Sequence, residues 1–368
     1  MDFICDHNQC SGCTACRNVC PRNAISMVEG EAGFKYPQVN HNSCINCGLC
    51  KAVCPVNSKK EDSGKTPLAY AAYNNDEKIR MESSSGGLFT LISSKIIEAG
   101  GVVFGAAFND ELFVVHDKAE TVEELEKFRS SKYMQSDLGR VYREVKIELD
   151  KGRKVLFTGT PCQVEGLVSY LKKDYDNLYL QDLICHGVPS KNVWKKYLEY
   201  KSKENGEKVK KVSFRNKENK GWNNYELKLT YDNKEEFSDH STDWYMRVFL
   251  NDIALRESCY HCNFKKRGRI SDITLADFWG INKVMPEMND EKGTSLIMVN
   301  SEKGKELFNS VIDNITYKEV DFDLAISNNG SMLTSPPRNP EREAFLAELE
   351  EGKDIEYLVK KYIFKEDK

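Results

Sequence analysis

The chain has 368 residues, enough for a small domain beside a larger one with a substantial core. Its 53 Lys and Arg against 57 Asp and Glu give a net charge of −4, and no basic arm or stripe indicates a nucleic-acid partner. Thirteen cysteines, without a secretory signal or a membrane-spanning apolar window, indicate metal or redox chemistry in a cytoplasmic protein, not disulfides.

Two cysteine runs with the same spacing lie near the N-terminus. CSGCTACRNVCP begins at Cys10, and CINCGLCKAVCP begins at Cys44, so each cysteine has a counterpart 34 positions later. In bacterial ferredoxins the first three cysteines of such a run hold one 4Fe-4S cluster, and the fourth, before proline, holds the other. Structural zinc would need two separated pairs of cysteines. We therefore predict one cluster at Cys10, Cys13, Cys16 and Cys54, and a second at Cys44, Cys47, Cys50 and Cys20.

Residues 1–56 are predicted to form this ferredoxin domain. Between the cysteine runs, AISMV and FKYPQV flank EGEAG and indicate a short hairpin. Residues 57–67, NSKKEDSGKTP, are polar and contain Gly and Pro, which is typical of a linker. Because this linker separates two different patterns, we expect the ferredoxin domain to be a detachable electron-transfer unit.

Residues 68–335 alternate between predicted strands and helices. KVLF, TGTPC and QVEGLVSYLKKDY read as strand, loop and helix, and NLYLQDLIC, HGVPS and KNVWKKYLEYKSKENG repeat that plan. The alternation predicts an α/β domain with a mainly parallel sheet. Residues 122–152 are expected to be largely helical, and residues 210–233 look like an antiparallel excursion. Residues 336–368 predict an amphipathic helical tail that serves packing.

Four further cysteines predict a third metal site. Cys162 and Cys185 each follow a predicted strand, and parallel neighbours would bring both thiols to one edge of the sheet. Cys259 and Cys262 have metal-ligand spacing, and we interpret the four as a third 4Fe-4S site. Zinc in the same four, or Cys162 as a reactive thiol at a helix N-terminus, are the alternatives. Cys5 is interpreted as an ordinary buried residue.

Two turns are candidates for binding a flavin phosphate. SSSGGLFT (Ser83–Thr90) and TGTP (Thr158–Pro161) each precede a helix and let backbone amides approach an anion, although an ordinary helix cap explains the first equally well. There is no GxGxxG motif. A flavin is expected on chemical grounds, because clusters pass single electrons whereas most metabolites change by two.

Six motifs carry a family resemblance: SGGLFT, TGTPCQ, DLICHGVPS, FRNKENKGW, SCYHCNF and DITLADFWG. In order, over residues 68–335, they resemble the beta-subunit family of coenzyme F-420 (F420) hydrogenase/dehydrogenase. The resemblance implies FAD, a further 4Fe-4S cluster at the four cysteines above, and hydride exchange with an organic partner over the flavin. That partner is the deazaflavin F420 in archaeal members and a tetrapyrrole in plant and cyanobacterial relatives. The implied FAD contacts are Ser85, Gly86, Gly87, Thr90, Thr158, Gly159 and Thr160.

Five other residues are weaker candidates. Arg215, Lys217 and Trp222 are placed near a polyanionic or aromatic substrate, or else on a solvated hairpin with one packed indole. His116 and His186 are possible proton donors, although a lone histidine is more often structural. No catalytic acid or base is assigned.

The leading hypothesis is an FAD- and iron–sulfur-dependent oxidoreductase. It would pass electrons between an organic hydride carrier, deazaflavin-like, and a redox partner protein that meets the ferredoxin domain. The alternatives are a ferredoxin-driven reductase of a specific metabolite and an electron-relay subunit without a small substrate.

Overall fold

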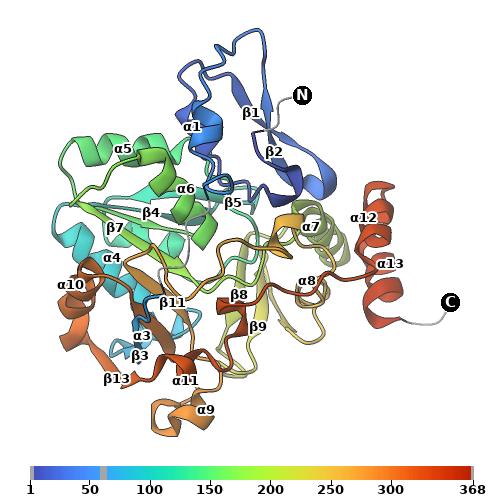
Figure 1. Cartoon of the computed structure of the whole chain (residues 1–368). Helices are drawn as coiled ribbons and strands as arrows, with labels where there is room; N and C mark the ends of the chain where they lie inside the picture. Colours follow the sequence, from blue (N-terminus) through green and yellow to red (C-terminus); the bar gives the residue numbers. More distant parts are fainter. Residues whose placement is uncertain (1–3, 59–63, 366–368) are drawn as a thin grey trace.

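The computed structural model of the chain describes residues 4–58 and 64–365, so residues 59–63 of the expected linker lie outside the described residues. The ferredoxin domain stands at the top of Figure 1, in blue. It contains the predicted hairpin, whose antiparallel pairing places Ile25 opposite Val39. Its elements are β1 (Ile25–Glu29), β2 (Lys35–Val39), α1 (Ala15–Val19), α2 (Leu49–Ala52) and the 3-10 turns η1 (His7–Gln9) and η2 (Glu31–Gly33).

An eight-stranded sheet forms the centre of the large domain. Its strand order is β13-β3-β12-β11-β7-β6-β4-β5. The pairings β4–β6, β6–β7 and β7–β11 are parallel, and the outer pairings are antiparallel. The strands are β3 (Leu68–Asn74), β4 (Val102–Phe108), β5 (Val114–Ala119), β6 (Val155–Thr158), β7 (Leu178–Leu183), β11 (Ile273–Asp277), β12 (Ser295–Val299) and β13 (Ile315–Val320). The sheet is thus mixed, with the expected parallel arrangement in its four central strands.

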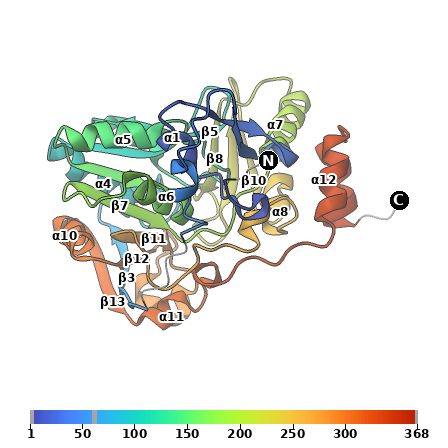
Figure 2. The same cartoon turned by 45° about the horizontal axis from the view of Figure 1, so that its top comes forward.

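Helices cover both faces of this sheet because its strands are apolar on both sides. Val102 and Phe104 of β4 pack with the helices α5 and α6, whereas Val103 packs with α4 and α10. Figure 2 shows α5 and α10 on opposite sides of the strands. The helices are α3 (Glu77–Met81), α4 (Leu88–Glu98), α5 (Val141–Asp150), α6 (Pro161–Leu171), α9 (Ile281–Val284), α10 (Glu302–Val311) and α11 (Phe322–Ile326).

The segment expected to be helical over residues 122–152 is helical only at its two ends. A 3-10 turn covers Glu123–Phe128, α5 begins at Val141, and residues 129–140 form an irregular loop apart from one bridge residue. The loop follows the sheet edge, where Asp137 exchanges backbone hydrogen bonds with Val114 and His116 of β5. Contacts distant in sequence therefore override the local helical pattern.

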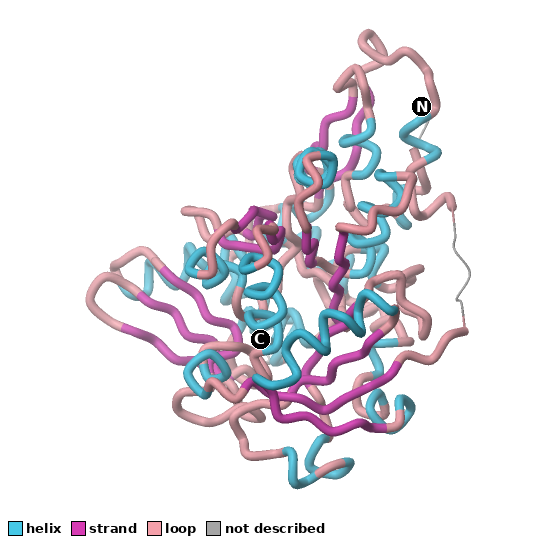
Figure 3. The backbone as a smooth tube through the Cα atoms, turned by 90° about the vertical axis from the view of Figure 1, so that its left-hand side faces the viewer, coloured by secondary structure: helices cyan, strands magenta, loops and turns pink. Residues whose placement is uncertain are grey.

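The antiparallel excursion is present as a separate three-stranded sheet, and Figure 3 shows it apart from the large one. The C-terminal segment, after crossing the molecule from α11, packs its helices against the same region, as Figure 1 shows. The elements are β8 (Lys211–Asn216), β9 (Glu226–Thr230), β10 (Glu235–Asp239), α7 (Lys191–Asn205), α8 (Trp244–Leu250), α12 (Arg342–Glu350), α13 (Ile355–Val359) and a π-helical turn (Lys360–Phe364). The tail thus serves packing, as expected.

The ferredoxin domain shares its core with the large domain. Phe34 and Tyr36 of the hairpin lie in one buried cluster with Trp194 of α7, and the turn η2 contacts both α7 and α12. The Glu350 carboxylate accepts a hydrogen bond from the Ala32 amide at 3.0 Å. The expectation of a detachable unit is therefore corrected: a polar linker does not imply a weak interface.

Among the described residues, no helix combines the length and apolar character needed to cross a membrane.

Candidate redox site

A cavity of about 520 Å³ opens at the carboxyl ends of the parallel strands β6, β7 and β11. This is the edge at which open α/β sheets bind ligands, and the volume is typical of a small-molecule site. Thr158, Leu183 and Asp277, the last residues of these three strands, all line the cavity. The sheet therefore supplies one face of a ligand site.

All four cysteines of the predicted third cluster line this cavity: Cys162, Cys185, Cys259 and Cys262. Burial raises the pKa of Cys185 to about 12 and that of Cys259 to about 11. Burial also raises the pKa of Cys162, although this residue opens α6, whose dipole favours a thiolate. The raised pKa disfavours Cys162 as a free reactive thiolate, because such a group needs a lowered one.

The donor set fits an iron–sulfur cluster. Cysteine thiols are the ligands that 4Fe-4S clusters use, and binding a cluster would displace their protons. In the described parts of the chain, no three His, Cys, Asp or Glu side chains converge as the ligands of one metal ion would.

A second, small cavity lies in the ferredoxin domain and is lined by Cys10, Cys13 and Cys16 of the first run and Cys54 of the second. This is the combination predicted from the exchange of the fourth cysteine. The cavity also contains Cys5, which is hydrogen-bonded to Cys10 and Cys54. That contact lowers the pKa of Cys10 to about 6 and that of Cys54 to about 7. Cys5 is therefore not an ordinary buried residue, and no spacing in the sequence indicated its position.

The remaining predicted set lies further out. Cys20, Cys44 and Cys50 are half-buried and Cys47 is exposed, whereas the first set is buried. The Ala24 amide donates a hydrogen bond to the Cys20 sulfur at 3.3 Å. Burial therefore decreases from the first set to the second.

The first set adjoins the cavity cysteines. Cys16 and Cys54 pack in one apolar cluster with Cys162, Cys262 and Phe264. The three sets thus form a series from the large cavity to the outer surface.

Helix α6 makes this close approach possible. A Cβ atom on Gly166 would lie 3.0 Å from the Cys13 sulfur and 2.8 Å from the Tyr142 hydroxyl. Only glycine leaves room for the Cys13 loop here.

Two helix N-termini face the large cavity. Gly87 is the N-cap of α4 and Thr160 the N-cap of α6, and both residues line the cavity. Helix N-termini favour anions such as phosphate. The cavity is also lined by several hydroxyl groups: Ser83, Ser84, Ser85, Ser130, Ser131 and Ser136. This wall fits the phosphates and ribityl hydroxyls of a flavin nucleotide.

Five of the seven predicted FAD contacts line the cavity: Ser85, Gly87, Thr158, Gly159 and Thr160. Gly86 and Thr90 support the wall from behind. Gly86 donates its N–H to Ser295 Oγ at 2.9 Å, and the hydroxyl of Thr90 accepts from Arg129 Nε at 3.3 Å.

The fold leaves no room for a side chain at Gly86. A Cβ atom at this position would lie 2.5 Å from the Ala72 carbonyl oxygen and 2.9 Å from the Ser295 nitrogen. We expect Gly86→Ala to lower the free energy of unfolding by about 3 kcal/mol, because backbone atoms must move to relieve the clash. Gly330→Ala is the control, since open space surrounds that position. Equal unfolding free energies for the two variants, measured in urea, would contradict this account.

A buried lysine holds the turn before α4. Lys217 Nζ donates to the carbonyl oxygens of Arg80, Ser85 and Lys292 at 2.8, 3.0 and 2.6 Å. Burial lowers its pKa to about 7. Lys217 does not line the cavity, so it acts in positioning and not in substrate contact.

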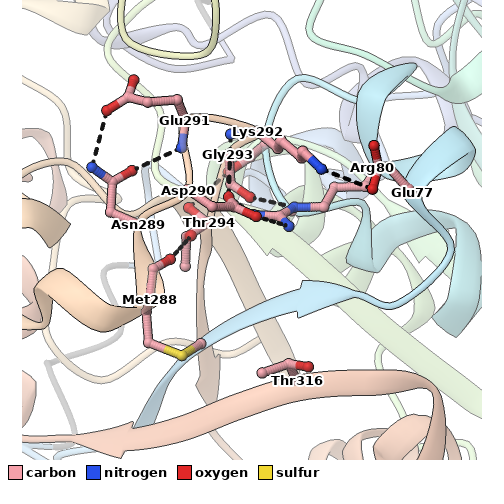
Figure 4. Close-up of polar contacts among 12 residues, drawn as sticks. Glu77, Arg80, Met288, Asn289, Asp290, Glu291, Lys292, Gly293, Thr294 and Thr316 are labelled. Atoms are coloured by element: carbon pink, nitrogen blue, oxygen red, sulfur yellow. Dashed lines mark hydrogen bonds and ion pairs between the residues drawn. The ribbon is translucent and has the colours of Figure 1, made fainter.

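Arg80 fastens the loop of residues 288–294 to this turn. Its Nε donates to the Gly293 carbonyl at 2.9 Å, and its guanidinium pairs with Asp290 at 2.5 Å. Figure 4 shows Arg80 between Asp290 and Gly293, with the Glu77–Lys292 ion pair beside it. These contacts fix the rear of the serine-rich wall.

Arg215 and Trp222 belong to one buried group around Asp277. The Asp277 carboxylate accepts from Arg215 Nη1 at 2.8 Å and from Trp222 Nε1 at 3.0 Å. Trp222 stacks on Trp279 with ring centroids 5.3 Å apart. Of the predicted trio, Arg215 lines the cavity and Trp222 does not, and neither lies on a solvated hairpin.

His116 is a buried, neutral positioning residue beside the TGTP turn. Its Nε2 lies 2.9 Å from the Thr158 carbonyl and its Nδ1 lies 2.6 Å from Ser136 Oγ. Burial lowers its pKa to about 4, so the uncharged ring holds the turn at neutral pH.

This histidine predicts an acid-sensitive fold. In the unfolded chain His116 is protonated below about pH 6.5, whereas in the folded chain it is protonated only below about pH 4. Stability therefore falls as the pH falls through this window, by about 2 kcal/mol between pH 7 and 5. In urea unfolding, His116→Gln should reduce this decrease in the free energy of unfolding, whereas the substitution of an exposed histidine, His41→Gln, should leave the decrease unchanged. An undiminished loss in His116→Gln would contradict the assignment.

His186 lines the same cavity. Its Nε2 is 2.5 Å from Asp252 Oδ1 and its Nδ1 is 3.3 Å from Ser331 Oγ. A histidine oriented by a carboxylate can move a proton, and of the two candidates only this one is not shut away from solvent.

Basic side chains near the cavity were not predicted from the sequence. Arg129, Lys132, Lys265 and Arg269 line it beside Arg215. These five basic residues come from three segments that are distant in sequence, so no local spacing indicated that they would lie together. Together with two paired carboxylates, Asp182 and Asp277, they leave an excess of positive charge.

A two-cluster ferredoxin domain joined to this mixed α/β domain defines an iron–sulfur electron-transfer protein. Residues 9–58 match the family model described as 4Fe-4S dicluster domain. Residues 152–323 match the model that describes the C terminus of the coenzyme F420 hydrogenase/dehydrogenase beta subunit. Over residues 152–323 the chain is therefore similar to the F420 hydrogenase/dehydrogenase beta-subunit family, and over residues 9–58 it is similar to dicluster ferredoxin domains.

A solved structure shares the fold. It is a chain of the xenon-derivatised F420-reducing NiFe hydrogenase complex from Methanosarcina barkeri, at 17% identity and a TM-score of 0.50. The alignment covers 74% of this chain and 91% of that chain. No curated protein matches the sequence.

Proposed function

We propose that the chain is an FAD- and iron–sulfur-dependent oxidoreductase that passes electrons between an organic hydride carrier and a one-electron protein. The observation that carries this proposal is the cavity lined both by the two candidate FAD-binding turns and by the four cysteines of the third cluster. When bound there, FAD would exchange two electrons with the organic carrier and single electrons with the clusters.

The chain's own residues would hold each group in place. Gly87, Thr160 and the serine wall would bind the flavin phosphates at two helix N-termini. Lys217 and His116 keep the two turns in position through backbone carbonyls. His186, oriented by Asp252, would move a proton at the cavity wall.

The arrangement of cysteines supports an electron path to the surface. The cavity cysteines adjoin the buried first set, and the second set ends at the exposed Cys47. A redox partner protein would therefore meet the ferredoxin domain beside Cys47.

The excess of positive charge favours a polyanionic hydride carrier of the deazaflavin type over a neutral metabolite. Lys132 Nζ lies at the cavity and donates to the carbonyls of Phe128, Arg129 and Ser130. Its charge is not paired with a carboxylate among the described residues, so an anionic ligand would be its partner.

The test is anaerobic reconstitution with iron, sulfide and FAD, followed by rapid mixing with reduced coenzyme F420 or, separately, with NADH. We expect one of these donors to bleach the flavin and a low-potential viologen then to accept the electrons. Flavin that binds but is bleached by neither donor, while viologen reduces it through the clusters, would favour the relay alternative. Failure to retain flavin would overturn the proposal.

Lys132 predicts how donor binding depends on pH. Burial lowers its pKa to about 7, so its charge, which attracts an anion, is lost as the pH rises through that value. We expect the Kd of reduced coenzyme F420 to rise about tenfold between pH 6.5 and 8.5. Lys132→Met should weaken binding at pH 6.5 and abolish the rise, whereas exposed Lys154→Met should do neither. A pH-dependent Kd that persists in Lys132→Met would assign the effect elsewhere.

A further inference from the structure

Arg256 is a buried cation that forms no ion pair with a carboxylate among the described residues. The residue is 1% exposed, and its guanidinium makes three hydrogen bonds, all to uncharged oxygens. They are the carbonyl of Cys10 at 2.7 Å, the carbonyl of Lys35 at 3.0 Å and the side-chain oxygen of Gln135 at 3.0 Å. Within residues 4–58 and 64–365, no carboxylate forms an ion pair with it. A buried charge is costly unless an anion lies beside it, and the guanidinium also contacts the side chain of Cys10, a ligand of the first predicted cluster.

Two cysteine sets meet at this residue. The guanidinium lies against the Cys10 loop, where a Cβ atom on Gly12 would be 3.1 Å from Nη1. The Arg256 carbonyl accepts a hydrogen bond from the Cys259 amide at 2.8 Å, and its own amide donates to Val188 at 2.9 Å. Arg256 therefore touches the first ferredoxin set with its side chain and the cavity set with its backbone.

We propose that Arg256 is the positive charge that sets the reduction potentials of the two adjoining clusters and joins them. This inference rests on the cluster sites of the proposed function. A 4Fe-4S cluster with four thiolates is anionic and gains further negative charge on reduction, so a nearby cation stabilises the reduced form. One electron leaves one cluster as the other gains it, and no proton need move.

A second feature of the chain supplies a control for a purely structural role. Arg342 is also 1% exposed and also binds the ferredoxin domain, through Glu31 at 3.2 Å. Its charge, however, is compensated by Glu31, Glu257 and Glu343. If Arg256 only fastened the two domains, Arg256→Met and Arg342→Met would behave alike.

Gln135 offers a way to cancel the charge and keep the arginine. Its Oε1 accepts from Arg256 Nη1, and its Nε2 donates to the Ser11 carbonyl at 2.9 Å. Gln135→Glu has nearly the same shape and places a carboxylate 3.0 Å from the guanidinium. Gln135→Glu should therefore lower the reduction potentials of the adjoining clusters, as Arg256→Met does. Arg256→Lys keeps the positive charge, so its potentials should stay close to those of the wild type.

The experiment uses the whole chain, reconstituted with iron, sulfide and FAD, and an EPR-monitored redox titration. We expect Arg256→Met and Gln135→Glu to decrease the equilibrium constant for reduction of an adjoining cluster about tenfold, or about 59 mV. Arg342→Met should shift no potential. If Arg256→Met fails to load clusters, the potentials of Gln135→Glu and Arg256→Lys still test the role of the charge.

Two failures are distinguishable. Wild-type protein that binds only the two ferredoxin clusters would overturn the cluster sites of the proposed function. Three loaded clusters whose potentials are unchanged in Arg256→Met and Gln135→Glu, or equal shifts in Arg342→Met, would overturn the role of Arg256 alone.

Discussion

Replacing Cys162 and Cys185 by serine should lower the iron content from about twelve atoms per chain to about eight, with sulfide falling in parallel. Both thiols line the large cavity, and a 4Fe-4S cluster that loses two of its four cysteines is not expected to assemble. The two ferredoxin clusters should remain, because their cysteines lie elsewhere. Electron transfer from the flavin to a viologen should then fall by orders of magnitude, since the intermediate carrier is missing.

Cys5→Ser is the matched control for this double variant. Cys5 shares the small cavity with Cys10, Cys13, Cys16 and Cys54, which already provide four ligands. We expect its iron content to stay at about twelve atoms. Twelve atoms in the double variant would remove the third cluster from Cys162 and Cys185, and a loss of iron in Cys5→Ser would make Cys5 a ligand.

Removing residues 1–66 should leave a chain that does not fold into a stable large domain. The deletion uncovers the cluster around Trp194 and removes both carbonyl acceptors of the buried Arg256. Each lost partner of a buried charge costs on the order of 2 kcal/mol or more, in a protein with about 5–15 kcal/mol to spare. We expect aggregation or a molten state by near-UV circular dichroism, with no flavin bound.

Cutting the chain without removing the ferredoxin domain is the control for this deletion. A protease site inserted in the linker between Ser58 and Gly64 should yield two fragments that co-elute and keep FAD, because the interface remains intact. A truncated chain that folds and retains flavin would show that the large domain is independent after all.

The cysteine sets could be predicted from the sequence because the spacing of cysteines within a short run is typical of cluster ligands. Three thiols at intervals of three residues define one side of a cluster, and the repeat identifies the exchanged ligand. The α/β fold of the large domain could likewise be predicted, because predicted strands and helices alternate along the sequence. The two turns at the cavity follow from their positions directly before a helix.

What could not be predicted depends on contacts between distant segments. The loop at residues 129–140 has a helical pattern, yet Asp137 pairs with β5 and the serines of the loop line the cavity. Arg256 lies in no motif, and its role depends on acceptors more than 200 positions away in sequence, at Cys10 and Lys35. Lys217 was a candidate for a position near a substrate, but in the fold its amino group is buried and donates to backbone carbonyls.

The contact of the hairpin turn with the last helices has a consequence for biosynthesis. Glu31 pairs with Arg342, and the Ala32 amide donates to Glu350, so the ferredoxin domain is completed by residues that are translated much later than its own. The nascent ferredoxin domain therefore waits for some 300 residues before its interface closes. Cluster insertion before that point would proceed on a half-covered site, so assembly machinery that delivers iron and sulfide should act after Glu350 has been translated and has docked on the hairpin turn.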